Sequence, residues 1–509
     1  MNLRVGSLVE PLTGRRWDPA RIQGEYRNRL AYFQRQGLAP ADLVFIHYGN
    51  TLELFVDLLA IWTLGGCAVP LDPQLTHFEV ETLAQAAAPR FSLWRGEVDS
   101  GASARLEALG VKVIQTAAAT KEGECTHPEP YSPDLLSLDQ PALVLFTSGT
   151  TGQPKGVVHT HRSLLALWMN LRNRLDIEKF CRTLCLLPTH FGHGLICNCL
   201  FPWLSGQDLF IIPSGRTELV MQLGSLLDDC GITSMSSVPA IWRLALKLGK
   251  PPTLGRLEQV FCGSAPLSAL LWKGIQEWTG TKDVINAYGI TETGSWVAGT
   301  AANGVTLEDG LVGPPWGAEI RILKSSGTTP PPSLASECVG GEPGYVWLKT
   351  PALMKGYLGR EDLTNQAVSE GWFSTGDIGL VNDRGMLYLR GREREEINRG
   401  GTKVYPGDID AVAEQYDQTL DVCTFGYEDP LLGENVGIAV VLRSASEENL
   451  RELYNGLKER VARFQMPQRW YLLDQIPRTP RGKINRSKVA RICAELQPVD
   501  HHKLVRGGS

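Results

Sequence analysis

The sequence lacks a long uninterrupted hydrophobic run. Its most apolar stretch, residues 52–71, contains Glu53, Asp57 and two glycines, so it does not have the composition of a membrane-spanning helix. The first residues contain no apolar core of the kind that a signal peptide has. An excess of basic residues is also missing, because the formal net charge is −5, and this balance gives no electrostatic footprint for nucleic acid. These absences predict a cytoplasmic protein with no membrane span and no nucleic-acid partner.

The C-x-x-C spacing of cysteines is absent too. Eleven cysteines, an odd number, are scattered over the chain, which is typical of free thiols in a reducing compartment. Residues 181–199 combine several cysteines with His190 and His193, and four such ligands would be needed for a structural zinc site. No C-x-x-C pair occurs and the spacing matches no common zinc pattern. The favoured interpretation is therefore that these cysteines are small core residues.

The length of 509 residues exceeds what one hydrophobic core supports, so two or three domains are expected. In the first part of the chain, strand-like apolar segments alternate with segments of helical spacing, which predicts an α/β fold with parallel strands. Residues 97–140 are weakly patterned and are expected to form connections. From residue 313 to 383, short strands with Gly/Pro-rich turns indicate a β subdomain. We predict a large N-terminal domain at residues 1–391 and a small C-terminal domain at residues 392–509.

The most informative stretch follows the apolar segment 142–146, which is predicted to be a buried strand. It is rich in glycine and hydroxyl residues and closes on Lys155. Glycines let a backbone approach an anion, N–H groups and hydroxyls can point at phosphate oxygens, and the lysine adds positive charge. It is not a Walker A loop, because Gly156 stands where that loop has Ser or Thr; a flexible surface turn is the alternative. The predicted phosphate-binding residues are Thr147, Ser148, Gly149, Thr150, Thr151, Gly152 and Lys155.

Residues 147–156 resemble the phosphate loop of the acyl-adenylate-forming (AMP-binding) enzyme superfamily, which includes acyl- and aryl-CoA synthetases. Further motifs of that family follow in the expected order. The resemblance implies a large N-terminal domain of two αβ layers plus a β subdomain, with a small mobile α+β C-terminal domain. It also implies two steps. ATP, with Mg²⁺, and a carboxylic acid give an acyl-adenylate and pyrophosphate, and a thiol then displaces AMP to form a thioester.

Residues 288–293 resemble the family's second signature, which lines the adenosine and acyl sites. The residue types fit that role, because Tyr288 offers an aromatic face to a purine and Gly289 permits close approach. Thr291 can bond phosphate, and Glu292 can hold a magnesium ion that also touches phosphate. The alternative is a strand-to-helix turn with a capping threonine. The resemblance further assigns to the nucleotide Gly263, Ser264, Ala265, Asn286 and Ala287, and to the metal Glu292 and Thr147.

Residues 373–379 resemble the third signature. The carboxylate of Asp377 beside a glycine turn can accept both ribose hydroxyls of ATP, although a plain β-turn aspartate would look the same. Arg392 follows at the family's spacing and is expected to support the ribose and phosphate. Arg394 stands where the family has its hinge residue, usually Asp or Lys, and a hinge only needs to absorb changes in backbone torsion.

Lys483 lies on a glycine turn close to the C-terminus. By itself it could be a solvated tail charge. Its match to the family's Gly-Lys motif makes it the leading catalytic residue, together with Thr291 and Glu292. The resemblance implies that the lysine stabilises charge developing between the acyl carboxylate and the α-phosphate, and that the small domain rotates between the two half-reactions. Gly400 and Gly401 are expected on the thiol side.

Residues 188–194 align with a fourth signature that borders the acyl pocket. This chain has His-Phe where many members have Phe-His, which puts Phe191 at the gate. Amino-acid-activating domains usually hold the substrate ammonium with an aspartate just after this motif, and residues 195–201 contain no acidic residue. An uncharged acyl or aryl acid is therefore predicted. The expected pocket residues are Phe191, His193, Gly263 and Gly289, with Trp168 and Trp242 nearby.

The thiol acceptor is either coenzyme A or the 4′-phosphopantetheine of a carrier protein. Residues 400–410 look more like the corresponding stretch of free-standing CoA ligases. No carrier domain follows Lys483, so any carrier protein is expected to act in trans. Three alternatives remain open: a stand-alone adenylation enzyme that loads an amino acid onto a carrier protein, an inactive ATP-binding scaffold, and a luciferase-like monooxygenase. Intact Lys483, Glu292 and Asp377 disfavour the scaffold.

Overall fold

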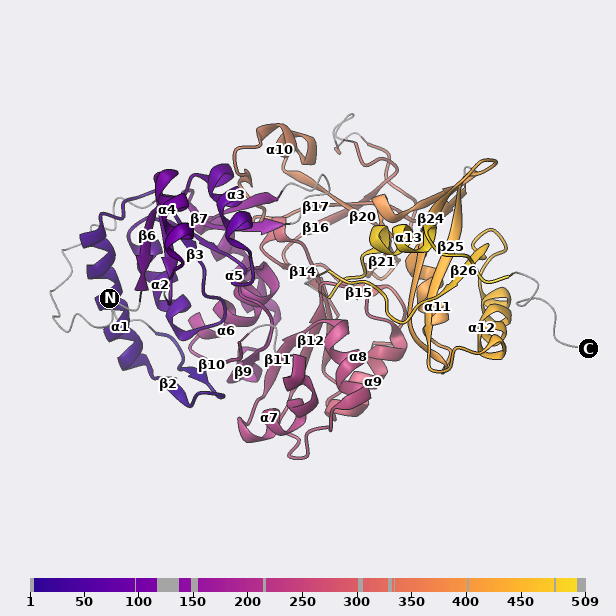
Figure 1. Cartoon of the computed structure of the whole chain (residues 1–509), viewed down its shortest axis with the longest axis horizontal. Helices are drawn as coiled ribbons and strands as arrows, with labels where there is room; N and C mark the ends of the chain where they lie inside the picture. Colours follow the sequence, from indigo (N-terminus) through magenta and orange to yellow (C-terminus); the bar gives the residue numbers. More distant parts are fainter. Residues whose placement is uncertain are drawn as a thin grey trace, which may run out of the picture.

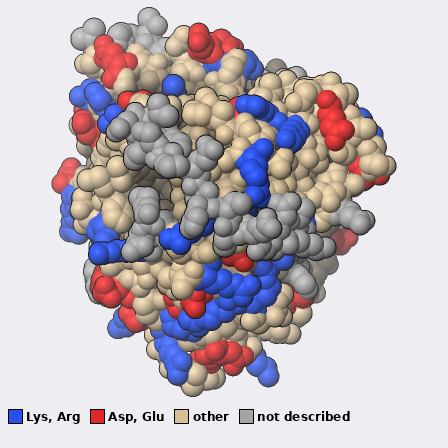
Figure 2. All heavy atoms as spheres, turned by 90° about the vertical axis from the view of Figure 1, so that its left-hand side faces the viewer, with Lys and Arg blue, Asp and Glu red and all other residues tan. Residues whose placement is uncertain are grey.

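The structure is a computed structural model that describes residues 4–96, 98–116, 137–147, 154–213, 217–300, 305–327, 332–333, 335–400, 402–479 and 482–500. A large part contains three sheets, and a small part, orange and yellow at the right of Figure 1, contains a fourth. No helix among the described residues is long and apolar enough to cross a membrane. Lys and Arg are interspersed with Asp and Glu over the end of the large part seen in Figure 2.

The first sheet has the strand order β18-β8-β7-β4-β3-β5-β6. Strands β3 to β7 are parallel, and β8 and β18 are antiparallel to their neighbours. The strands β4 and β5 are completely buried, as expected for parallel strands covered by helices on both faces. The elements are β3 (Leu43–Ile46), β4 (Cys67–Pro70), β5 (Phe91–Trp94), β6 (Lys112–Gln115), β7 (Pro141–Thr147), β8 (Lys155–Thr160), β18 (Gly356–Tyr357), α1 (Pro19–Gln36), α2 (Leu52–Thr63), α3 (His77–Ala87) and α4 (Ser100–Ala108).

The expectation that residues 97–140 form only connections is wrong for its first half. The helix α4 and the strand β6 lie there, and β6 is the edge strand of the first sheet. Both elements carry a weak sequence signal, because α4 buries only Ala102 and Leu106 and β6 fully buries only Ile114. Residues 117–136 lie outside the described residues.

The second sheet has the order β14-β13-β12-β11-β9-β10-β1-β2, with the six inner strands parallel. Strand–helix alternation therefore predicted the fold class of both sheets correctly. The elements are β1 (Leu8–Glu10), β2 (Arg15–Trp17), α5 (His161–Arg174), η3 (Ile177–Phe180), β9 (Arg182–Cys185), η4 (His193–Leu200), α6 (Phe201–Leu204), β10 (Asp208–Ile211), η5 (Thr217–Gln222), α7 (Leu223–Asp229), β11 (Ser234–Ser237), α8 (Pro239–Leu248), β12 (Gln259–Gly263), α9 (Ala269–Thr279), β13 (Val284–Gly289), η6 (Thr291–Thr293) and β14 (Trp296–Gly299).

The third sheet is antiparallel, with the order β15-β21-β20-β17-β16 and β19 beside β20. It corresponds to the β subdomain indicated by the short strands and Gly/Pro turns of the sequence. The elements are β15 (Leu311–Gly313), β16 (Glu319–Leu323), β17 (Gly344–Lys349), α10 (Glu361–Ala367), β19 (Val368–Ser369), β20 (Trp372–Val381) and β21 (Leu387–Arg392).

The small part is α+β. Its sheet has the order β23-β22-β25-β24, with β26 parallel to β25, and a separate hydrophobic cluster fills it. The predicted boundary after residue 391 lies one residue before the end of β21, and the short helix η7 begins at Glu393. The elements are η7 (Glu393–Glu395), β22 (Ile397–Arg399), β23 (Thr402–Val404), α11 (Pro406–Ala413), β24 (Thr419–Asp429), β25 (Gly433–Leu442), α12 (Glu447–Arg460), β26 (Arg469–Leu472) and α13 (Arg486–Ala494).

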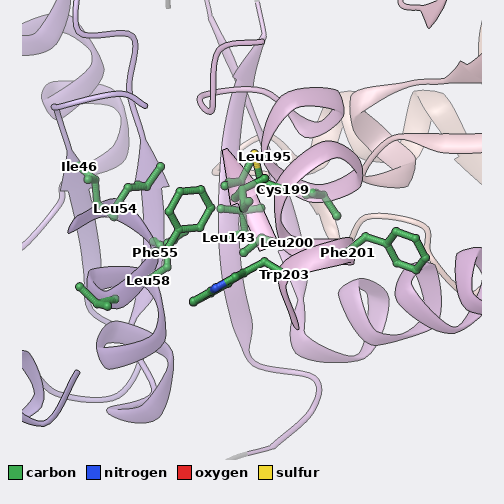
Figure 3. Close-up of a cluster of buried hydrophobic side chains, with 14 of the residues drawn as sticks. Ile46, Leu54, Phe55, Leu58, Leu143, Leu195, Cys199, Leu200, Phe201 and Trp203 are labelled. Carbon is green, nitrogen blue, oxygen red and sulfur yellow. The ribbon is translucent and has the colours of Figure 1, made fainter. Parts of the chain in front are cut away.

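The main hydrophobic core joins the first two sheets. Figure 3 shows Phe55 and Leu58 of α2 facing residues of η4 and α6, and the rings of Phe55 and Trp203 meet edge to face with centroids 5.4 Å apart. All eight residues of the π-helix η4 are buried. Because η4 starts at His193, the core fixes the position of a residue that the sequence assigned to the acyl pocket.

Candidate active site

A cavity of about 950 Å³ opens where the three sheets of the large part meet the small part. Its volume lies in the range of small-molecule sites. The flanks of the predicted phosphate loop, Thr147 and Lys155, face each other across the β7–β8 pair, whereas Ser148, Gly149, Thr150, Thr151 and Gly152 lie outside the described residues. The predicted site residues that line the cavity are Thr147, Lys155, Phe191, His193, Ser264, Gly289, Thr291, Glu292, Arg392, Arg394 and Lys483.

The remaining predicted residues that the structure describes are not part of this wall. Gly263 pairs with Ala287 inside the second sheet, and the amide of Asn286 donates a hydrogen bond to the carbonyl of Leu311, 2.6 Å away. Gly400 lies in the turn between β22 and β23, and its N–H donates to the carbonyl of Leu432. Gly401 lies outside the described residues. The others that do not line the cavity are Ala265, Tyr288 and Asp377.

On the phosphate side, Tyr357 connects two residues that the sequence had assigned separately. The ammonium of Lys155 lies 5.2 Å from the centroid of the Tyr357 ring, and the Tyr357 hydroxyl donates to Oε1 of Glu292 over 2.7 Å. Burial and, after it, the negative charge of Glu292 raise the pKa of Tyr357, so the phenol keeps its proton. The cation and the carboxylate are thus held at fixed positions by one aromatic side chain.

The turn that carries Thr291 and Glu292 is fixed from behind by a buried histidine. Nε2 of His159 lies 2.8 Å from the carbonyl oxygen of Thr291, and burial lowers the pKa of His159 to about 4. The ring is therefore neutral, and Nε2 must carry its proton because a carbonyl only accepts. Just before the turn, a Cβ on Gly289 would come within 1.8 Å of the carbonyl oxygen of Ser295, so only glycine fits there.

Asp377 lies directly behind the cavity wall, next to Gly376, which does line it. Its Oδ1 accepts from Nε of Arg392 at 2.6 Å, and its Oδ2 accepts from the hydroxyl of Tyr288. Asp377 and Arg392 are directly opposite each other in the β20–β21 pair. The sequence motif thus corresponds to an ion pair between the buried Asp377 and the partly exposed Arg392 at the edge of the cavity, with Tyr288 buried behind it rather than open to a ligand.

The part of the wall that the sequence predicts to be the acyl side is organised around His193. Its Nδ1 lies 2.8 Å from Oγ of Ser264, and its Nε2 lies 2.5 Å from Oγ of Ser236. Burial and then the nearby charge of Lys483 lower the pKa of His193 to about 3, so the ring is neutral and fully hydrogen-bonded. Ser264 has φ +64°, a torsion that costs energy for a residue other than glycine and that occurs often at functional sites.

The two tryptophans expected near the acyl pocket are not in its wall. Trp242 is completely buried against Trp278, with ring centroids 5.6 Å apart, and Trp168 donates to Ser205. Phe191 does line the cavity and packs on Leu187 and Val238. Large aromatic residues on helices are often drawn into the core by their apolar area, which accounts for the burial of Trp242.

The cysteine-rich segment contributes to the core. Cys185, Cys197 and Cys199 are buried in the main hydrophobic cluster, and His193 is bonded to two serines. Among the described residues, no group of three or more His, Cys, Asp or Glu side chains is placed to hold a metal ion. These positions fit the interpretation of the cysteines as small core residues.

The small part reaches the cavity through Lys483. A Cβ on the preceding Gly482 would lie 3.1 Å from Cβ of Ala240, so the lysine turn touches the start of α8. Beside it, Arg243 of α8 pairs with Glu414 at 2.6 Å. The large and small parts are therefore in direct contact in this conformation, with the lysine directed to the cavity that the other predicted residues line.

Tyr357, Ser236 and His159 contact site residues but were not predicted from the sequence. Tyr357 belongs to a two-residue strand that pairs with β8 some 200 positions earlier in the chain, Ser236 is one of three serines in β11, and His159 is one histidine in an apolar strand. None has a local motif, because each acts on a residue distant in sequence. Only for Tyr357 does a Gly-Tyr pair in a turn-rich region offer a weak signal.

Comparison with known proteins agrees with these motifs. The family model of AMP-binding enzymes matches residues 25–358. A probable CoA ligase of Humulus lupulus is 29% identical over 92% of this chain and 90% of its own, and a fatty acid–[acyl-carrier-protein] ligase of Streptomyces coeruleorubidus is 30% identical over 91% and 89%. Among solved structures, ATP-bound MatB of Rhodopseudomonas palustris superimposes with a TM-score of 0.84 at 22% identity, over 97% of this chain and 96% of the other.

The fold and the cavity are those of an enzyme that brings a nucleotide and a carboxylic acid together. The chain belongs to the AMP-binding enzyme family. It is an AMP-forming acid–thiol ligase, which activates a carboxylic acid with ATP as an acyl-adenylate and passes the acyl group to a thiol. The o-succinylbenzoate CoA synthetase of Bacillus subtilis, solved with ATP and a magnesium ion, shares the fold with a TM-score of 0.80 at 24% identity, over 95% of this chain and 96% of the other.

Proposed function

We propose that this enzyme makes the CoA thioester of an acyl or aryl carboxylic acid whose non-reacting part is uncharged. The observation that carries this proposal is the neutral wall around His193. Both ring nitrogens of His193 are bonded to serine hydroxyls, its pKa is lowered to about 3, and Phe191 adds an apolar surface. A buried charged substrate group without a partner would cost several kcal/mol.

The charged groups of the cavity suit the other substrate. Thr147 and Lys155 are proposed to bind the phosphates, while Asp377 and Arg392 receive the ribose past Gly376. Glu292 and Thr147 supply oxygen donors of the kind Mg²⁺ prefers, with phosphate oxygens completing its coordination. When bound, the ion neutralises phosphate charge; the residues of the chain then orient the acid so that its carboxylate oxygen attacks the α-phosphorus and pyrophosphate leaves.

Lys483 is proposed to stabilise the charge that develops between the acid and the α-phosphate. A preorganised ammonium in a partly desolvated site is worth most where charge accumulates in the transition state. Its position agrees with this role, since it lines the same cavity as Thr291 and lies close enough to His193 to lower that residue's pKa.

For the second step, we propose that the small part turns about Arg394 as one domain. Arg394 lies in the short helix η7 between the last strand of the third sheet and the small part. The turn at Gly400 and Gly401 would then approach the acyl-adenylate, and the thiol would attack the acyl carbon while AMP leaves. A rotation of this kind changes the torsions of very few residues.

Coenzyme A is the proposed thiol. Several relatives are CoA ligases, including an oxalate–CoA ligase of Arabidopsis thaliana and a 2-succinylbenzoate–CoA ligase of Bacillus licheniformis, although the Streptomyces relative uses a carrier protein. The ten cysteines among the described residues are all free, which supports a reducing compartment such as the cytoplasm.

The test is a panel of acids in a pyrophosphate-release assay, with and without CoA, and with thioester products identified by mass. Benzoate-like and medium-chain acids should have the highest kcat/KM. The 20 proteinogenic amino acids and the doubly charged oxalate and sulfoacetate should be poor, by roughly a hundredfold or more given the cost of burying a charge. An amino acid or a dianion at the top would contradict the neutral pocket, and release of thioester only with a carrier protein would contradict CoA.

A further inference from the structure

Arg478 stabilises the N-terminal side of the turn that carries Lys483. The two oxygens of Asp421 accept from Nη2 of Arg478 at 2.7 and 2.8 Å, and Nη1 of the same side chain donates to the carbonyl of Gly482 at 3.1 Å. Arg478 and Ile484 form an isolated bridge on either side of the turn. One arginine thus ties the backbone next to Lys483 to β24, the strand that contains Asp421.

Arg486 stabilises the C-terminal side of the turn. Its Nη1 donates to the carbonyl of Thr424, also in β24, and approaches Oδ2 of Asp410 in α11, both at 2.7 Å. Its Nε donates to Glu395 at 2.9 Å, the residue directly after the proposed hinge. Figure 1 shows β24, α11 and α13 together in the small part. The largely buried guanidinium therefore joins the lysine turn, the hinge segment and the body of the small part.

Within the turn, the backbone is closed on itself. The N–H of Thr479 donates to the carbonyl of Lys483 at 2.8 Å, and the N–H of Gly482 donates to the carbonyl of Thr479 at the same distance. The side chain of Lys483 has several rotatable bonds, so only its backbone can be fixed in advance. The two arginines supply this fixing from outside the turn, through charge-assisted bonds, which are stronger than neutral ones.

We infer that Arg478, paired with Asp421, and Arg486 are positioning residues that hold Lys483 for the adenylation step. The inference rests on the catalytic role proposed for Lys483. Misplacing a catalytic group by about 1 Å can cost roughly a hundredfold in rate. Arg478 bonds the carbonyl of the residue before the lysine, and Arg486 stands three residues after it and ties that end of the turn to β24. The thioester step should not need them, because the lysine is proposed to leave the site before it.

The Arg478–Asp421 pair is the better one to break. Its side chains are 21% and 20% exposed, so the neutral amides Arg478→Gln and Asp421→Asn remain hydrated. By contrast, Arg486 bonds the buried Asp410, and removing one partner of a buried pair can prevent folding. Arg491→Gln is the matched control, since Arg491 is an exposed arginine of α13 that donates to the carbonyl of Ser487 in its own helix.

The two half-reactions are measured separately, with the acid of highest kcat/KM. Adenylation is followed as pyrophosphate release, and the second step as thioester formation from synthetic acyl-adenylate and CoA. Arg478→Gln and Asp421→Asn should each slow adenylation by roughly 10- to 100-fold and leave the second step within about twofold, which also shows that the small part is folded. Arg478→Lys keeps the charge but loses the two-point contact. Its adenylation rate should lie between those of the wild type and Arg478→Gln.

The same substitution in a Lys483→Ala background distinguishes positioning from a general structural role. Arg478→Gln should cause no further loss there, because the group it positions is gone. Equal losses with and without Lys483, or equal losses in both half-reactions, would overturn the inference. If Lys483→Ala itself keeps full adenylation activity, the proposed role of Lys483 fails; if Lys483→Ala is inactive but Arg478→Gln is not, only the positioning inference fails.

Discussion

The wall around His193 and the turn around Lys483 contribute to one cavity but are built in opposite ways. His193 is the first residue of a π-helix whose eight residues are all buried in the main core. Lys483 is on an exposed turn of the small part, held by the arginine contacts on its two sides. Packing fixes the first position, whereas a few ion pairs fix the second.

This difference matches what each residue is proposed to do. A wall that selects the acid must keep its shape in every state, and close packing against many neighbours provides that. A lysine that acts in only one step must leave, and contacts confined to the small part let it move together with that part. Substitutions in either region test this difference.

The largest expected effect is that of Lys483→Ala on adenylation. Losing one preorganised charge should reduce pyrophosphate release by about a hundredfold or more, while thioester formation from preformed acyl-adenylate continues. Lys488→Ala, an exposed lysine on α13, is the control. Near-normal pyrophosphate release from Lys483→Ala would show that the turn is only structural.

Next in size is Glu292→Gln, which tests the fixed side of the phosphate region. The amide keeps the shape and one oxygen but loses the charge that would hold Mg²⁺. The rate should fall by roughly tenfold, and the Mg²⁺ concentration for half-maximal activity should rise. Tyr357→Phe, which removes only the hydroxyl that donates to Glu292, should shift the same titration less. Identical Mg²⁺ titration curves for the wild type and Glu292→Gln would contradict magnesium binding by Glu292 and indicate that it only shapes the turn.

A smaller effect is expected for Ser236→Ala. The hydroxyl bonded to Nε2 of His193 disappears, and a net contribution of about 1 kcal/mol per hydrogen bond corresponds to roughly fivefold. This change should raise KM for the acid and leave KM for ATP unaltered. Ser234→Ala lies on the same strand and bonds Gln259 instead; an equal effect there would mean that the serine acts through general packing.

The smallest predicted effect concerns pH. Burial lowers the pKa values of His47 and His159 to about 4 and that of His193 to about 3, below the ordinary value near 6.5. The unfolded chain therefore binds more protons below about pH 6.5, and the stability these neutral histidines contribute is lost as pH falls from there toward 3 to 4. Urea midpoints of the wild type should decline over this window more steeply than those of His159→Gln. Parallel curves would show that His159 is not buried as a neutral ring.

Several residues that the sequence singled out belong to short local motifs. Thr147, Lys155, Thr291, Glu292 and Lys483 all line the cavity, and each lies in or beside a turn rich in glycine or hydroxyl residues, which carries its own sequence signal. The alternation of strands and helices likewise predicted the parallel sheets. Such patterns are local, so they can be recognised without knowledge of the tertiary structure.

The residues that were missed depend on contacts between distant segments. Tyr357 reaches Glu292 only because β18 pairs with β8, and Ser236 reaches His193 only because η4 packs beside β11. The position of Trp242 likewise depends on a distant partner, since it packs against Trp278 in the core. Register between strands and the packing of large side chains are set by the whole chain, and no short window of sequence contains them.

The burial of η4 has a consequence for the exchange of backbone amide protons with solvent. An amide inside a wholly buried helix becomes accessible only when the surrounding core opens, so the protons of residues 193–200 should exchange at rates close to those of global unfolding. The N–H groups of Thr479 and Gly482 close a small turn at the surface, where brief local opening is enough. The helix η4 and the lysine turn contribute to the same cavity, yet the lifetimes of their hydrogen bonds would differ by orders of magnitude.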